Sequence, residues 1–132
     1  MPSALGEILN QIVTQDPRYK QDAYLFVMEA LSYTQRKFER LQHVAGEELL
    51  EGIKELLLEK FGPMTITVLK HWGIHSTDDF GCIVFNLVEH RVLSKTLEDN
   101  IEAFKNRYDF HDVFDKGYRQ SLAQKLSRML DY

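Results

Sequence analysis

The segment 21–40 constrains the fold more than any other part of the chain. Between residues 23 and 35 it has Glu29 as its one charged side chain, although charged residues make up 27% of the sequence. Its large apolar side chains fall on two sides of a helical wheel: Tyr24, Val27 and Leu31 on one, and Phe26 and Tyr33 on the other. A helix that is apolar on two faces is buried on both. We therefore expect this helix either to run through the middle of the fold or to form a subunit interface.

Five further helices are predicted from apolar spacing and from helix start and stop signals. They are expected at residues 3–14, 47–61, 63–72, 76–90 and from 112 or 116 to 130. Gly62 and Pro63 separate the third helix of the chain from the fourth, and Gly73 ends the fourth. Ser76 is a good N-cap, and Asp79 three residues later completes an approximate capping box.

The order of elements in residues 47–110 is typical of a winged helix: three helices, the second of them short, followed by a β-hairpin. The hairpin is expected from residues 91–96 and 101–110, with the acidic tip Leu97-Glu98-Asp99-Asn100. A helix capped by Thr96 is the alternative, because the Glu, Ala and Lys residues within 102–105 favour helix.

The expected fold class is therefore mainly α with a small β component. Two N-terminal helices pack on a winged-helix-like unit of three helices and a hairpin, and one more helix follows at the C-terminus. We predict that residues 1–132 form a single domain. It divides into N-terminal helices (1–40), a winged-helix-like core (41–115) and a basic C-terminal helix (116–132).

The net charge of −4 is distributed unevenly along the chain. Residues 76–115 contain nine acidic and four basic side chains, whereas residues 116–132 contain one acidic and four basic ones. The acidic middle and the basic tail could attract each other within one molecule or meet different partners.

The outer face of the helix at 76–90 is unsuited to DNA. A recognition helix needs cationic and amide side chains there, but this face presents Asp78, Cys82, Phe85, Asn86 and Glu89. The exposed Phe85 indicates a protein contact, either with the second helix of the same chain or with a different protein. The predicted partner surface consists of Phe26, Tyr33, Cys82, Phe85, Asn86 and Glu89.

The C-terminal helix combines a basic and an apolar face. Its apolar side chains are Tyr118, Leu122, Leu126, Met129 and Leu130, and its candidate anion-binding residues are Lys116, Arg119, Lys125 and Arg128. Such a helix suits a phosphate backbone, a membrane surface or a groove on a partner. Docking on its own domain is the remaining alternative.

Several motifs occur in an order that resembles a family of short bacterial proteins without an assigned activity. They are AYLFVMEAL at 23–31 with Tyr33, HVAGEELLEGIKEL at 43–56, FGPM at 61–64, VLKHWGI at 68–74, DFGCIVFNLVE at 79–89, LSKT at 93–96 and YDF at 108–110. The resemblance covers residues 16–115 and implies no catalytic or binding residues. At position 45 the resemblance implies Ser or Thr, but this chain has Ala, which weakens the N-cap of the third helix. The tail at 116–132 lies beyond the shared region.

No motif for nucleotide binding, nucleophilic catalysis or zinc catalysis is present. His71 and His75 have i,i+4 spacing, but Gly73 between them is expected to end the helix. The acidic residues near Cys82 disfavour a nucleophilic thiolate by charge repulsion. We therefore predict no enzyme activity and no cofactor or metal site.

Two acidic features admit a functional or a structural interpretation. Glu29, within an apolar helix, could be a general base or a carboxylate that faces solvent. The acidic side chains of residues 109–115 alternate with phenylalanines. This segment could be a docking strip for a basic partner or a loop anchored to the core by Phe110 and Phe114.

The chain lacks an apolar run of about 18 residues and a signal-like N-terminus. Its one cysteine, Cys82, excludes an internal disulfide. We expect a cytoplasmic, soluble protein without a membrane span.

These observations predict a non-enzymatic protein-interaction or adaptor module that binds a protein partner or forms a homodimer. The alternative is a nucleic-acid-associated winged-helix protein that binds through its basic C-terminal helix.

Overall fold

The computed structural model describes residues 4–40, 43–93 and 101–130. The α-helices are α1 (Ala4–Gln15), α2 (Gln21–Lys37), α3 (Gly46–Phe61), α4 (Thr65–Trp72), α5 (Thr77–Glu89) and α6 (Gly117–Leu130). Shorter turns are the 3-10 helices η1 (Gly62–Met64) and η2 (Ile101–Phe104) and the π-helix η3 (Asp112–Lys116). The predicted, mainly α fold is confirmed, and the ends of the expected helices are shifted by only a few residues.

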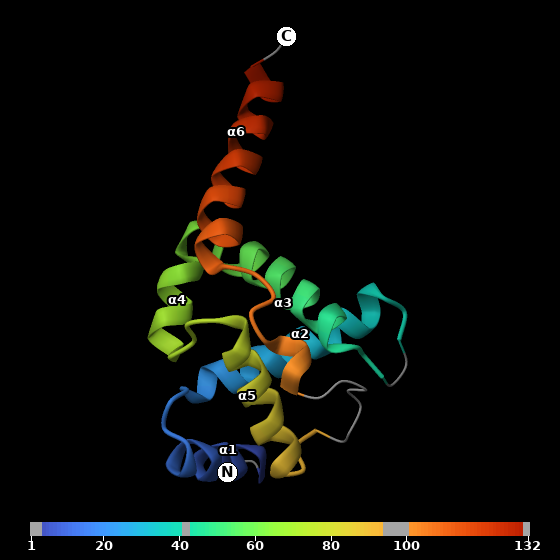
Figure 1. The fold of residues 1–132 in the computed structure, drawn as a ribbon, viewed down its shortest axis with the longest axis vertical. Helices are drawn as coiled ribbons and strands as arrows, with labels where there is room; N and C mark the ends of the chain where they lie inside the picture. The colour runs from blue at the N-terminus through green and yellow to red at the C-terminus, as the bar shows by residue number, and fades with distance from the viewer. Residues whose placement is uncertain (1–3, 41–42, 94–100, 131–132) are drawn as a thin grey trace.

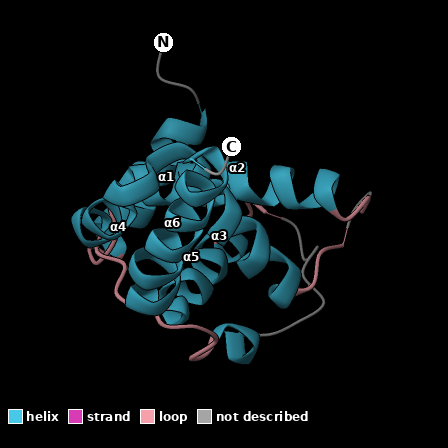
Figure 2. Cartoon of the chain, turned by 90° about the horizontal axis from the view of Figure 1, so that it is seen from above, coloured by secondary structure: helices cyan, strands magenta, loops and turns pink. Residues whose placement is uncertain are grey.

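The predicted β-hairpin is wrong where the structure describes it. Residues 91–93 and 101–110 contain no strand, and helices and loops make up the described chain (Figure 2). Ala103 and Phe104 are both buried, and η2 packs against α5 and α3. Successive side chains of a strand point to opposite faces, so a hairpin would bury only one of the two, whereas the 3-10 turn buries both.

The winged-helix-like core is therefore not supported. Three helices do occur in the expected order, α3, α4 and α5, but no wing follows them in the described residues. The expected acidic tip at 97–100 and the helix cap at Thr96 lie outside the described residues.

Helix α2 occupies the middle of the fold, as one of the two alternatives for it predicted. It packs against α1, α3 and α5 (Figure 1). On one face Tyr24 is buried, and on another Phe26 lies against Phe61 and Trp72, with ring centroids 6.3 and 5.4 Å apart. Coverage on both faces explains why the sequence of α2 is almost free of charge between residues 23 and 35.

Helices α2 and α3 approach closely at Gly52. A Cβ atom at position 52 would lie 1.9 Å from the hydroxyl oxygen of Thr34 on α2. Thr34 is fully buried, and its hydroxyl donates a hydrogen bond to the Ala30 carbonyl at 2.7 Å. The absence of a side chain at position 52 therefore allows the two helices to pack together.

The start of α3 compensates for the missing N-cap side chain at Ala45. The Glu48 carboxylate accepts a hydrogen bond from the Ala45 backbone N–H at 3.0 Å and another from Arg40 at 3.1 Å. Both bonds favour the charged carboxylate and lower the pKa of Glu48, the backbone bond most strongly. One half of a capping box thus remains where the residue at the N-cap cannot supply the other.

The loop before α2 packs directly against the end of α4. Gly73 ends α4 in a left-handed conformation with φ +87°, and a Cβ atom there would lie 2.0 Å from the Arg18 carbonyl oxygen. The Lys20 backbone N–H donates a hydrogen bond to the Trp72 carbonyl at 3.2 Å. Glycine is required at position 73 both for its φ and for this close approach.

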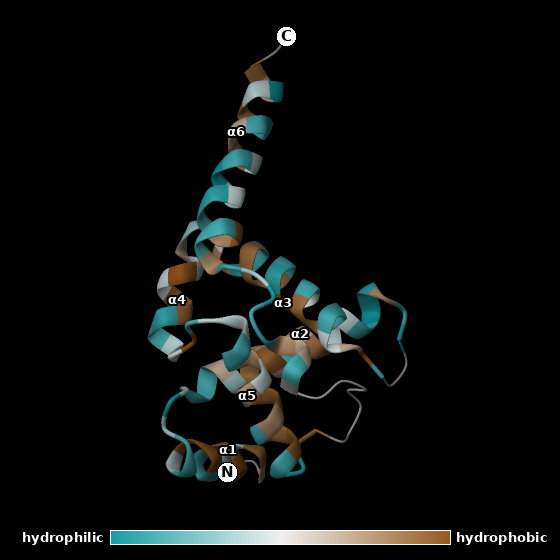
Figure 3. Ribbon diagram, in the orientation of Figure 1, coloured by the Kyte–Doolittle hydropathy of each residue, from teal (hydrophilic) through white to brown (hydrophobic). Residues whose placement is uncertain are grey.

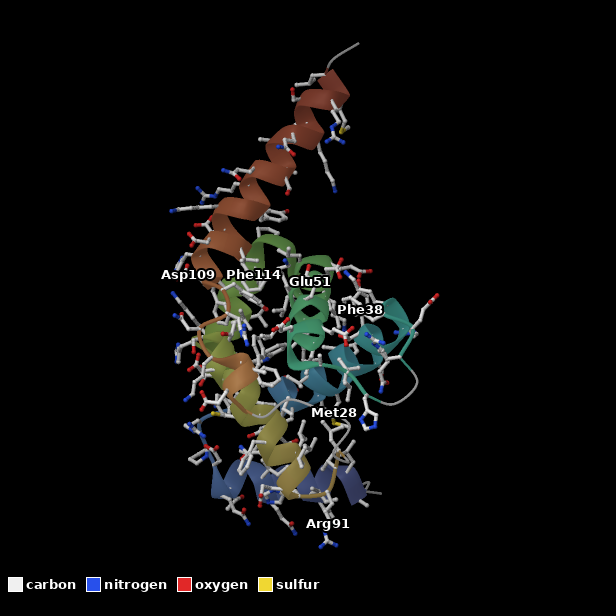
Figure 4. The ribbon with its side chains drawn as sticks, turned by 45° about the vertical axis from the view of Figure 1, so that its right-hand side comes forward. Met28, Phe38, Glu51, Arg91, Asp109 and Phe114 are labelled. Carbon is white, nitrogen blue, oxygen red and sulfur yellow. The ribbon has the colours of Figure 1, made fainter. Side chains whose placement is uncertain are left out.

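Aromatic side chains anchor the segment that leads to α6. Phe110 and Phe114 are buried, and their ring centroids lie 5.6 Å apart. The Tyr108 hydroxyl donates a hydrogen bond to the Leu50 carbonyl at 3.0 Å, and burial raises the pKa of Tyr108. In Figure 4, Asp109 and Phe114 lie just below the start of α6. The structure confirms that Phe110 and Phe114 anchor this segment to the core.

Helix α6 leaves the body of the protein and projects away from it (Figure 1). No residue of α6 is buried. Hydrophilic and hydrophobic residues alternate along the projecting helix (Figure 3). The alternative in which this helix docks on its own domain is not what the structure shows.

Candidate interaction surfaces

The outer face of α5 is only partly open. Phe85 is 53% exposed and Glu89 is exposed, whereas Cys82 and Asn86 are half-buried. The Asn86 amide donates hydrogen bonds to Asp16 at 2.9 Å and to the Tyr24 hydroxyl at 3.0 Å. The chain itself therefore covers Asn86, which leaves Phe85 and Glu89 as the accessible members of the predicted partner surface on α5.

Asp16 ties the loop between α1 and α2 to α5. Its two carboxylate oxygens accept hydrogen bonds from the Arg18 guanidinium at 2.8 and 2.7 Å, in addition to the bond from Asn86. These bonds stabilise the charged carboxylate, and the pKa of Asp16 lies well below its usual value, with the Arg18 hydrogen bond as the largest cause.

Tyr19 and Asp79 extend this polar network into the core. Tyr19 is 1% exposed, and its hydroxyl donates a hydrogen bond to Asp79. Burial, followed by this bond, raises the pKa of Tyr19. The other carboxylate oxygen of Asp79 accepts backbone N–H bonds from His75 and Ser76 at 2.7 and 3.2 Å. Within the described chain no buried polar side-chain atom lacks a partner, so the network holds the fold together and leaves no idle group aimed at a ligand.

Phe26 and Tyr33 do not join the α5 residues in one surface. Phe26 is 5% exposed and lies in the core. The prediction that Phe26 belongs to the partner surface is therefore wrong, and its side chain contributes to packing. Tyr33 is half-buried at a groove of about 680 Å³ between α2 and α3. Glu29 lines the same groove, faces solvent and forms an ion pair with Lys60 at 2.8 Å, in agreement with the solvent-facing interpretation of Glu29.

The apolar face of α6 is open to solvent. The described chain exposes seven large hydrophobic side chains, and four of these belong to α6. They are Leu122 (42% exposed), Leu126 (49%), Met129 (65%) and Leu130 (84%), which we call the α6 stripe. The other three, Leu25, Met64 and Phe85, lie on separate helical elements. Large contiguous apolar patches mark interaction sites, whereas single exposed apolar residues are ordinary.

The four candidate cations of the C-terminal helix fall into two pairs. Lys116 lies 3.7 Å from Asp112, and Arg119 lies 2.8 Å from Asp115. Lys125 and Arg128, further along α6, form no ion pair with the described residues. The end of α6 that is distant from the body is therefore the more available for an anionic partner.

A groove lies at the base of α6, between it and α3. Its volume is about 630 Å³. It is lined by Lys54, Leu58, Glu59, Asp112, Val113, Gly117, Tyr118, Ser121, Leu122 and Lys125. The α6 stripe begins in this groove at Leu122 and continues outward along the helix. The sequence indicated the stripe, but it gave no signal of the groove, because the groove depends on how α3 and α6 meet.

In residues 4–40, 43–93 and 101–130, no group of three or more His, Cys, Asp and Glu side chains could hold a metal ion. His71 and His75 are both exposed. None of the described helices combines the length and the apolar character needed to cross a bilayer. Comparisons with protein-family models, curated proteins and solved structures find no match to this chain.

Proposed function

We propose that this chain is a non-enzymatic protein-interaction module that presents α6 to a partner protein as a docking helix. The observation that carries the proposal is the α6 stripe: four large apolar side chains stand open on a helix that buries none of its residues in the body. Docking of an amphipathic helix through its apolar face into a groove is a common mode of protein recognition.

The cations of α6 narrow the class of partner. Lys125 borders the stripe and lines the groove, and Arg128 lies one turn further along the helix. A partner surface with apolar pockets and carboxylates at its rim fits this helix best, because charge complementarity adds to association rate and specificity. The proposed region lies beyond residues 16–115, where the chain resembles a family of short bacterial proteins. We propose that the docking helix is an addition to that shared body.

Co-purification from the native host tests the proposal with two matched variants. Leu126→Asp places a carboxylate in the stripe, and Gln124→Asp places the same group on the opposite side of α6. We expect wild type and Gln124→Asp to retain the same proteins and Leu126→Asp to lose them. If all three retain the same set, α6 is not the docking element.

The alternative function is binding of nucleic acid through the same helix. Lys125 and Arg128, which form no ion pair with the described residues, favour it. An electrophoretic titration against DNA and RNA at two salt concentrations separates the two functions. Phosphate contacts release counterions, so binding through these cations falls steeply with salt. Binding that is lost in Lys125→Gln/Arg128→Gln but kept in Leu126→Ser, which removes the apolar side chain without adding a negative charge, supports the alternative.

A further inference from the structure

We infer that the partner of α6 is the α6 of a second copy of this chain, bound in antiparallel orientation. This inference rests on the proposed function, because it names the occupant of the same stripe.

The groove at the base of α6 is open in the described part of the chain. Leu58 on α3 and Val113 and Tyr118 at the start of the projecting helix give the groove apolar walls. The tip has the opposite character, because its apolar side chains Met129 and Leu130 are 65% and 84% exposed. The exposed apolar side chains at the tip of one helix therefore fit the apolar walls of the groove at the base of another.

A two-fold symmetric pair brings tip and base together. In such an interface the same patch serves both copies and must be complementary to itself. Helix α6 has 14 residues and is about 21 Å long, so the tip of one helix reaches the base of an antiparallel partner. Helix α6 projects from the body (Figure 1), so antiparallel pairing places the two bodies at opposite ends of the helix pair.

The charges select the antiparallel orientation. Between Gly117 and Leu130 the helix contains Arg119, Lys125 and Arg128 and no acidic residue, so parallel helices would place the tip cations of the two copies together. Around the base, Asp112 and Asp115 pair with Lys116 and Arg119 of their own chain, whereas Glu59 lines the groove and forms no ion pair with the described residues. Antiparallel helices place Arg128 near the tip of one copy close to the base carboxylates of the other.

The same charges favour a second copy over a different anionic partner. Residues 1–115 carry a net charge of −7 and residues 116–132 a net charge of +3. The body of one copy therefore attracts the tail of another, and one sequence supplies the basic helix, the apolar groove walls and the acidic body together.

Light scattering of the full chain tests the association. We expect a mass about twice 15.5 kDa for wild type and for Gln124→Asp, and 15.5 kDa for Leu126→Asp. Each dimer loses two leucine contacts and gains two carboxylates in the stripe, so the dissociation constant should rise by at least about a hundredfold. Leu126 is half-exposed, and an unchanged thermal transition of the monomer will show that the variant is folded. A monomeric wild type, or a dimer that persists in Leu126→Asp, overturns the inference.

Disulfide trapping tests the orientation. Two variants carry a single cysteine on a Cys82→Ala background, Leu130→Cys at the tip and Val113→Cys at the base. Antiparallel helices predict that oxidation crosslinks the two variants only when they are mixed. A crosslink of Leu130→Cys with itself indicates parallel helices and overturns the proposed arrangement.

The experiments distinguish failure of the docking function of α6 from failure of the second copy as its partner. If wild type is monomeric but Leu126→Asp loses proteins that wild type retains from the host, the docking function stands and the second copy is excluded. If the variants retain the same proteins and wild type is monomeric, both fail.

Discussion

Phe26 and Leu25 are neighbours on α2, yet the fold buries the first and leaves the second 45% exposed. The sequence pattern placed Phe26 on a second apolar face but could not say what would cover it. In the structure Phe61 and Trp72 cover it, from the ends of α3 and α4. The same apolar pattern would also fit a helix at a subunit interface.

Truncation of Phe26 tests its assignment to the core. We expect Phe26→Ala to lower the free energy of unfolding by about 3–5 kcal/mol, because it leaves a cavity between two aromatic rings. Leu25→Ala, one position away on the same helix, should cost less than about 1 kcal/mol because its side chain is half in solvent. Urea unfolding of both variants measures the difference, and equal losses would contradict the burial of Phe26.

Alanine substitutions at two glycines with positive φ compare the stability cost of backbone strain alone with the cost of strain plus a steric collision. Gly73 has φ +87° and a carbonyl oxygen 2.0 Å from the position of a Cβ atom, whereas at Gly62 (φ +48°) the nearest atom is 3.6 Å away. Gly62→Ala should cost about 1–3 kcal/mol from backbone strain alone. Gly73→Ala should cost clearly more, because the loop at Arg18 must move. Chemical denaturation of the pair checks this order, and a smaller loss at position 73 would refute the close approach.

At the scale of elements, the polar network of Asp16 joins the loop between α1 and α2 to α5. Its effect appears as pH dependence, because the pKa of Asp16 is lowered in the folded protein from an ordinary value of 3.8. The unfolded chain then binds the proton more readily, so this contribution to stability is present above about pH 4 and is lost as the pH falls through the lower folded pKa.

Asp16→Asn tests this link. The change removes the charge-assisted bonds to Arg18, so we expect a loss of about 1–2 kcal/mol at pH 7. The variant should also show a shallower decline of stability than wild type between pH 5 and about pH 2. Unfolding curves measured across this range give both quantities. Parallel pH profiles for the two proteins would mean that Asp16 has the same pKa in the folded and unfolded states.

Prediction at the element scale succeeded for helices and failed for the hairpin. The helices depend on apolar side chains spaced over three or four residues and on local signals such as Ser76, Gly73 and Pro63. Residues 101–104 are too few for such spacing to be informative. Their conformation is decided by burial of Ala103 and Phe104 against helices that are distant in the sequence.

At the scale of the whole molecule, α6 is separable from the body. None of its residues is buried, whereas α1 buries Leu9 and Ile12. We expect a chain that lacks residues 117–132 to keep a cooperative thermal transition, with Tm within a few degrees of the full chain.

Removal of residues 1–15 is the matched control for this truncation, since it takes away a helix of similar length that contributes to the core. Circular dichroism of both truncated chains measures the transitions. The shorter N-terminal variant should melt at a much lower temperature or lose its transition, and a comparable loss on removal of α6 would show that α6 supports the body.

In the candidate site, as in the fold, features set by local spacing were predicted better than features set by contacts between distant segments. The apolar stripe and the basic residues of α6 were evident from the sequence, because a helix places residues three and four apart on one face wherever it lies. The prediction of the α5 surface was less accurate. The sequence could not show that Asn86 forms hydrogen bonds with Asp16 and Tyr24, which precede it by more than sixty positions.

The amino-acid pattern is enough to predict that the chain is mainly helical, where its helices begin and end to within a few residues, and that its last helix is amphipathic and basic. These properties depend on neighbours within one or two turns. The three-dimensional fold was needed to show that α2 is central, that residues 101–104 form a turn, and that α6 projects with its stripe uncovered. Each of these features depends on which surfaces are buried between segments that are distant in the sequence. The spacing of apolar residues within one helix does not indicate which segment covers its apolar face.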